Sequence, residues 1–169
     1  MVNQKIEKII NEQINAEMYS SYLYLAMSSY CANLGLAGFA NWLKIQAKEE
    51  LSHADFMFNY LIERNGRVVL DTIEKPPLDW KNVIDIFEET FKHEQYISSR
   101  INNILTVALE ENDHATASFF KWFIDEQVEE EATAADVLSK LKLTKAEGAA
   151  LFFMDQELAK RVYVQPMLK

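Results

Sequence analysis

Five side chains that bind metal ions well interrupt the apolar stripes of four long stretches of helical pattern. They are the carboxylates Glu17, Glu50, Glu94 and Glu130 and the imidazole of His53. Each lies three or four positions from an apolar residue of its own stripe, so both must face the same way, towards a core. Ionised carboxylates in a dry core destabilise a fold by several kcal/mol each unless something neutralises them. The pattern therefore predicts an interior site that needs cations.

Divalent metal ions would neutralise this site. Two such ions match the four carboxylates in charge, and neutral His53 adds a nitrogen ligand. No lysine or arginine lies on the same stripes at that level, which argues against internal ion pairs, although a shared proton would relieve part of the repulsion. Oxygen-rich ligation with one imidazole suits iron or manganese better than structural zinc. For any single position the alternative is a glutamate on a solvated face; five matched positions on four helices argue against coincidence.

Helices must position these groups. No glycine or proline occurs in residues 1–34, 39–65 or 78–147, and apolar residues recur there three and four apart. We predict helices over about 4–33, 37–65, 80–111 and 114–141, and a shorter one over 144–160. Asp79 would cap the third helix, Gly66 would end the second in a left-handed conformation, and Thr144 with Glu147 would form a capping box for the fifth.

One connection, residues 67–79, is long and reads as extended chain ending in Pro76 and Pro77. At ~3.3 Å per residue it spans about 43 Å, about the length of the second predicted helix at ~1.5 Å per residue. It can therefore run the length of the molecule and make the second and third helices parallel. We predict an all-α fold, a four-helix bundle with one long crossover and a short fifth C-terminal helix, as a single domain over residues 1–169.

Composition excludes several classes of protein. The chain has 49% hydrophobic and 25% charged residues, which excludes disorder, and too few glycines and prolines for an all-β fold. Its net charge of -9 repels phosphate backbones and anionic membranes but attracts metal cations. A single cysteine allows no internal disulfide, the start is polar, and no apolar run approaches the roughly 18 residues of a membrane span. We expect a cytoplasmic protein without nucleic-acid or membrane partners.

Four motifs together resemble a known family. They are Glu17-Met-Tyr-Ser-Ser-Tyr-Leu-Tyr24, Glu49-Glu50-Leu-Ser-His53, His93-Glu94 and Trp122-Phe-Ile-Asp-Glu126-Gln127-Val-Glu129-Glu130. The chain resembles the haem-free bacterial and archaeal ferritins over essentially its whole length. The resemblance implies one iron site from Glu17, Glu50 and His53 and a second from Glu50, Glu94 and Glu130, with Glu50 bridging. Gln127 would sit beside the pair as a hydrogen-bonding group.

The chain departs from the general ferritin-like pattern in one ligand. That pattern has Glu-x-x-His on two helices, whereas the fourth helix here has Gln127 and Glu130 at this spacing. The missing imidazole favours a site that binds Fe²⁺, oxidises it and passes it on over one that keeps a permanent cofactor. Leu51 stands where a haem-binding relative would supply methionine, so we expect no haem.

The resemblance also implies roles for residues around the pair. Glu49, Glu126 and Glu129 match a third iron site next to Glu130 and directed away from the bundle axis; their pattern alone favours a solvated helix face. Tyr24 would lie near the iron pair as an electron donor, although by pattern alone it is ordinary core, and Trp122 is a weaker candidate for the same role. We expect His93 on the surface and His114 near a helix end.

The resemblance implies an iron-storage protein with ferroxidase activity. Fe²⁺ would be oxidised by O2 or H2O2 and stored as a ferric oxy-hydroxide mineral inside a hollow homo-oligomeric shell of 24 subunits. The apolar fifth helix, with Phe152, Phe153 and Met154, would expose enough apolar surface to indicate a subunit contact. Two alternatives stay open: a small di-iron oxidase without mineral storage, and an all-helical interaction protein whose central acids are inert.

Overall fold

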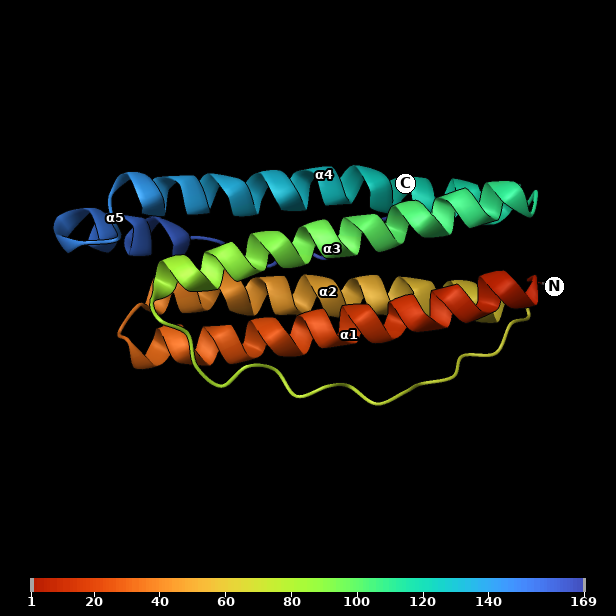
Figure 1. The fold of residues 1–169 in the computed structure, drawn as a ribbon, viewed down its shortest axis with the longest axis horizontal. Helices are drawn as coiled ribbons and strands as arrows, with labels where there is room; N and C mark the ends of the chain where they lie inside the picture. Colours follow the sequence, from red (N-terminus) through yellow and green to blue (C-terminus); the bar gives the residue numbers. More distant parts are fainter. Residues whose placement is uncertain (1, 169) are drawn as a thin grey trace.

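The structure is a computed structural model that describes residues 2–168. All regular secondary structure in these residues is helical (Figure 1). Its helices are α1 (Gln4–Asn33), α2 (Ala37–Glu63), α3 (Val83–Glu110), α4 (His114–Leu143) and the short α5 (Gly148–Leu158). In Figure 1, α1 and α2 are antiparallel, α3 and α4 are antiparallel, and α2 and α3 point the same way. These helices confirm the predicted fold class, an all-α four-helix bundle with a short fifth helix. None of the helices described is both long and apolar enough to cross a bilayer.

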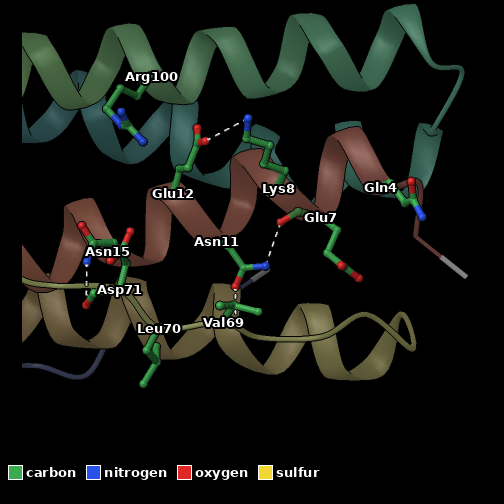
Figure 2. A pocket seen from close by; sticks show the side chains of 10 residues that line it. All are labelled: Gln4, Glu7, Lys8, Asn11, Glu12, Asn15, Val69, Leu70, Asp71 and Arg100. Atoms are coloured by element: carbon green, nitrogen blue, oxygen red, sulfur yellow. Dashed lines mark hydrogen bonds and ion pairs between the residues drawn. The ribbon is translucent and has the colours of Figure 1, made fainter.

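The crossover between α2 and α3 runs along the bundle from one end to the other, beside α1 (Figure 1). Side chains of α1 hold it there, because Val69 donates its backbone N–H to Asn11 Oδ1 at 2.7 Å, and Asn11 Nδ2 donates to the carbonyl of Arg67 at 2.9 Å. Asn15 Nδ2 donates to the carbonyl of Thr72 at 3.1 Å. Figure 2 shows side chains of α1, of this segment and of Arg100 that line a pocket between them. The extended chain thus satisfies its backbone with asparagine side chains instead of a strand partner.

Two helix ends near the crossover differ from the sequence prediction. α3 begins at Val83, not near Trp80, because Asn82 is its N-cap and accepts from the backbone N–H of Asp85 at 3.0 Å. α2 ends at Glu63, and the left-handed residue after it is Asn65 (φ 54°), not Gly66. Asparagine tolerates this conformation better than other residues with a Cβ, so it took the role expected of glycine.

The start of the fifth helix also differs. Thr144 does not open a capping box; it is the C-cap of α4, which continues to Leu143. Lys145 and Ala146 have φ of 54° and 52°, which breaks the helical path before Glu147. α5 therefore begins at Gly148 and ends at Leu158, shorter at both ends than the predicted 144–160.

The apolar core is divided into two clusters. One contains Leu23, Phe39, Phe87 and Leu141, and the other contains Ile6, Ile10, Met57, Ile101 and Phe120. Along each long helix the side chains of one cluster give way to those of the other close to the middle of the helix. The residues between them are buried and polar, so the fold carries a polar layer across the centre of its core.

Candidate metal centre

The polar layer is made of the side chains that the sequence singled out. Glu17 comes from α1, Glu50 and His53 from α2, Glu94 from α3, and Gln127 and Glu130 from α4, and none is more than 6% exposed. Each shares its helix face with buried apolar neighbours three or four residues away, which is why folding the apolar stripes inwards also buries the acids. Four helices thus converge on one level with their polar groups facing one another.

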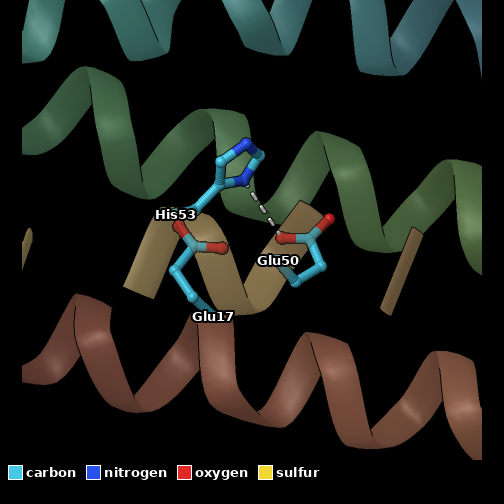
Figure 3. A group of neighbouring side chains, drawn as sticks. All are labelled: Glu17, Glu50 and His53. Carbon is cyan, nitrogen blue, oxygen red and sulfur yellow. Dashed lines mark ion pairs between the residues drawn. The ribbon is translucent and has the colours of Figure 1, made fainter. Parts of the chain in front are cut away.

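Three of these side chains meet closely enough to hold one ion. Glu17, Glu50 and His53 each offer a ligand atom, and these atoms lie within 4.8 Å of one another. Figure 3 shows Glu17 reaching up from α1 towards the Glu50 and His53 side chains of α2. His53 Nδ1 is 3.4 Å from Glu50 Oε2, longer than the about 2.7–3.2 Å of an ordinary N–H···O bond. Carboxylate oxygens and an imidazole nitrogen around one point are a donor set for iron or manganese.

Several polar atoms of this layer have no hydrogen-bond partner among residues 2–168. They are Glu17 Oε2, Glu50 Oε1, His53 Nε2 and Gln46 Oε1, all buried. Buried polar atoms are almost always hydrogen-bonded, and exceptions cluster where an ion or a catalytic group is needed. Three of these four atoms belong to Glu17, Glu50 and His53, the residues whose ligand atoms meet within 4.8 Å, so the residues present fit a bound cation.

Glu94 and Glu130 form the other half of the layer and are held by neutral donors. The Tyr24 hydroxyl donates to Glu94 Oε1, and Gln127 Nε2 donates to Glu94 Oε2 at 3.2 Å. Gln46 Nε2 donates to Glu130 Oε2 at 2.7 Å. Neutral donors fix the direction of each carboxylate without supplying a positive charge that would pair with it.

The pKa values show that the carboxylates repel one another. Burial raises the pKa of Glu50 well above its usual value, and the charges of Glu94, Glu17 and Glu130 raise it further. Burial and the charge of Glu130 raise the pKa of Glu94 to about 8, against the lowering effect of the bonds from Tyr24 and Gln127. Without a cation, protons therefore neutralise part of the layer near neutral pH, as the sequence analysis allowed. A metal ion that binds here must displace them.

The acids expected at a third site lie at the edge of this layer. Glu49 and Glu126 are half-buried, and Glu129 is exposed. Burial raises the pKa of Glu49 to about 7, and the charges of Glu130 and Glu126 add to this, while Arg161 opposes it. Burial also raises the pKa of Glu126, with contributions from Glu130 and Glu129. The charge of Glu130 thus reaches both Glu49 and Glu126, but among the described residues only Glu17, Glu50 and His53, not these three acids, bring ligand atoms within 4.8 Å of one another.

The aromatic and histidine predictions had mixed outcomes. Tyr24 is fully buried beside Glu94, and the Trp122 ring lies 5.7 Å from that of His53. His93 is not a surface residue: it is half-buried, its Nε2 lies 2.7 Å from Ser20 Oγ, and burial lowers its pKa to about 4. The rings of Tyr19 and Tyr24 cover it, each 5.9 Å away. His114 is exposed at the start of α4, as expected.

Sequence reasoning missed three residues that touch the site. Gln13 Nε2 donates to Glu17 Oε1 at 2.7 Å, Gln46 holds Glu130, and Arg161 pairs with Glu49. Gln13 and Gln46 stand four positions before Glu17 and Glu50, so the same helical periodicity would have placed them on the inner face. Arg161 follows the last helix, and no periodic signal points to it.

A four-helix bundle with one long crossover and a buried layer of carboxylates and imidazole defines a ferritin-like metal-binding protein. Residues 7–144 match the family described as the ferritin-like domain. The chain belongs to the ferritin family, as the sequence motifs indicated.

Relatives and solved structures agree with this assignment. A bacterial non-heme ferritin of Bacteroides fragilis is 43% identical over 161 residues, which cover 95% of this chain and all of the relative. The bacterial non-heme ferritin of Campylobacter jejuni is 38% identical over 156 residues, covering 92% of this chain and 93% of the relative. The crystal structure of an open pore ferritin from Archaeoglobus fulgidus superposes with a TM-score of 0.95 at 44% identity, over 96% of this chain and 100% of that one.

Proposed function

We propose that this protein stores iron: it binds Fe²⁺ in the central layer, oxidises it, and deposits the product as a ferric oxy-hydroxide mineral inside a homo-oligomeric shell of 24 subunits. The observation that carries the proposal is the buried layer itself, in which carboxylates from four helices lie at one level and pair with no lysine or arginine of residues 2–168. The ferritin relatives and the similarity to a ferritin crystal structure support it.

Glu50 is central to the proposed ligand set. Glu17, Glu50 and His53 would bind one ferrous ion, and Glu50, Glu94 and Glu130 would bind the other, so Glu50 would bridge the two. The closeness of the first three and the effect of Glu94 and Glu130 on the pKa of Glu50 support this division. Hard carboxylate ligands favour Fe³⁺ over Fe²⁺, which helps to drive oxidation.

The reaction balances with either oxidant. Each of two Fe²⁺ ions loses one electron, and O2 takes both with two protons to become H2O2. When H2O2 is the oxidant, the same two electrons and two protons convert it to two molecules of water. The ferric ions then leave the layer for the mineral, so iron is the substrate and the protein is regenerated.

In this scheme the buried acids hold and release protons, and neighbouring side chains set the orientation of the Glu94 carboxylate. Glu50 and Glu94 hold protons in the metal-free protein because burial and repulsion raise their pKa values. Binding of Fe²⁺ would release these protons. The Tyr24 hydroxyl and the Gln127 amide aim the Glu94 carboxylate, and the hydrogen bond of Tyr24 to this proposed ligand supports its expected place beside the iron pair.

The proposal involves no haem, because Leu51 occupies the position expected for a methionine ligand and has no atom that binds iron. The proposal also places a third iron ion at Glu49, Glu126 and Glu129.

Phe152 and Phe153 are 60% and 69% exposed on α5, and burying them against other subunits would explain this apolar surface. We place the protein in the cytoplasm.

One experiment separates this function from its alternatives. Excess Fe²⁺ is added in air to the purified protein, and particle size and bound iron per chain are measured. Storage predicts a large particle that holds far more iron than its binding sites can, with O2 consumed. A small di-iron oxidase would elute as a small particle with about two irons per chain, and an inert interaction protein would neither bind nor oxidise Fe²⁺. Either of these results would overturn the proposal.

A further inference from the structure

The chain beyond α5 returns along the bundle instead of leaving it (Figure 1). Asn41 Nδ2, near the start of α2, donates to the carbonyl of Arg161 at 3.0 Å. Further along α2, the hydroxyls of Ser52 and Tyr163 lie 2.7 Å apart, and the Lys48 ammonium lies 5.6 Å from the centre of the Tyr163 ring. These contacts fix residues 159–163, hereafter the C-terminal tail, against the face of α2 that carries Glu49.

The tail brings one cation to the edge of the central layer. Arg161 Nη2 lies 2.6 Å from Glu49 Oε2, and the two side chains are only 24% and 15% exposed. The Arg161 guanidinium also lies 4.8 Å from the centre of the Trp42 ring, within cation–π range. Arg161 is thus held by the Glu49 carboxylate, by the Trp42 ring and by the hydrogen bond from Asn41 to its backbone carbonyl. Because the ion pair is little exposed, salt screens it only weakly.

Arg161 therefore forms an ion pair with Glu49, a carboxylate that a third metal ion would need as a ligand. Glu126 and Glu129, the partners expected for that ion, make no ion pair within residues 2–168. Arg161 belongs to the same chain as Glu49, so its local concentration at Glu49 does not depend on the iron supply. A metal ion must compete with it for the same oxygen atoms.

We propose that Arg161 is an internal counter-cation for Glu49, and that a metal ion binds at Glu49, Glu126 and Glu129 only when the guanidinium moves away with the C-terminal tail. Arg161 is thus a positioning residue that lowers the affinity of the third ion and leaves the two central ions unaffected. The inference rests on the proposed function, because it assumes that metal ions reach this edge of the layer.

The test is calorimetric titration of the assembled, metal-free protein with Zn²⁺, which binds without being oxidised or mineralised. Wild type is compared with Arg161→Gln, which keeps a polar side chain but removes the charge, and with Arg161→Lys, which keeps the charge. Lys160→Gln is the matched control, because Lys160 is the neighbouring residue and pairs with Glu157 in solvent. We expect Arg161→Gln to tighten the weakest class of zinc site about tenfold, Arg161→Lys to tighten it less, and Lys160→Gln to leave it unchanged.

A second measurement shows whether the effect passes through Glu49. In a Glu49→Gln background, Arg161→Gln should no longer change the zinc affinity, because the carboxylate for which the cations compete has gone. An equal effect of Arg161→Gln with and without Glu49 would overturn the inference. So would a change that is equal at all classes of site, which is the mark of a general structural role, or no change at all. Thermal unfolding of each variant verifies that it is folded before titration.

The proposed function and this inference fail in different ways. If wild-type protein bound no zinc at the central layer, the central assignment would be contradicted, while the effect of Arg161 on the edge site would still be read from the variants. If central binding were normal and Arg161→Gln had no effect, only the inference would be contradicted.

Discussion

The central carboxylate layer and the Glu49 edge differ in what neutralises them. Among the described residues no lysine or arginine pairs with Glu17, Glu50, Glu94 or Glu130, and the raised pKa values of Glu50 and Glu94 show that protons take that role. Glu49, one residue from Glu50 in sequence, is paired with Arg161. Protons leave freely when a metal ion arrives, whereas a tethered guanidinium must be displaced. Acids that are adjacent in sequence can therefore differ in what a metal ion must displace before it binds: a proton at Glu50, a guanidinium at Glu49.

The largest effect should separate Glu50 from Glu49. Glu50→Ala removes a proposed ligand of both central ions, so we expect the initial rate of Fe²⁺ oxidation to fall about 100-fold or more. Glu49→Ala affects only the third ion and should slow this rate about threefold or less. Stopped-flow measurement of oxidation at two Fe²⁺ per chain compares them. Equal rates for Glu50→Ala and wild type would refute the bridging assignment.

The next effect concerns the pH dependence of stability. The pKa of Glu94 is about 8 in the folded protein against an ordinary value of 4.5, so the folded state binds more protons between these values and the metal-free protein loses stability as pH rises through this window. Glu94→Gln removes this loss. We expect the metal-free variant to melt above wild type at pH 8, with a smaller difference at pH 5, although it binds iron less well.

Calorimetric melting curves of the metal-free shells at both pH values measure this difference. Glu12→Gln, at an exposed position of α1, is the control and should not change the pH dependence. A Glu94→Gln protein that loses stability between pH 5 and pH 8 as steeply as wild type would show that Glu94 does not carry the buried proton.

A smaller effect is expected for Tyr24→Phe. The Tyr24 hydroxyl lowers the pKa of Glu94 by donating to it, so its removal should raise the pH at which Fe²⁺ binding is half-maximal by about one unit. The loss of the donor should also slow oxidation about tenfold. Tyr30→Phe is the control, because the Tyr30 hydroxyl donates to the carbonyl of Trp80 away from the layer. An unchanged binding midpoint would contradict the role given to this hydroxyl.

The smallest effect should come from Gln46→Leu. This change removes the 2.7 Å bond to Glu130 but also removes Gln46 Oε1, a buried atom without a partner. Because the two effects on stability oppose each other, the melting temperature should change little. The affinity for the second central ion should fall about threefold, since Glu130 loses its fixed direction. A titration in which both central ions weaken equally would indicate a general loosening of the layer instead.

Most of the fold and the central side chains could be predicted because one physical rule governs both. A helix that buries its apolar stripe also buries any acid on that stripe, so Glu17 and Glu94 could be placed in the interior from spacing alone. The helix ends were less predictable, because Asp79 and Asn82 are both residue types that cap helices well, and in the structure Asn82 is the cap. His93 was misplaced because its helix position points away from Glu94, yet the tyrosines of α1 cover it.

The sequence by itself determined the number and type of helices, their order and the depth of the acids, because these follow from local periodicity and chain length. Only the tertiary structure decided which neutral donor holds each carboxylate, and that Arg161 reaches Glu49 from the C-terminal tail. Such contacts join residues distant along the chain, and their distances depend on how helices and tail pack. Periodicity can say which way a side chain faces; packing decides what it meets there.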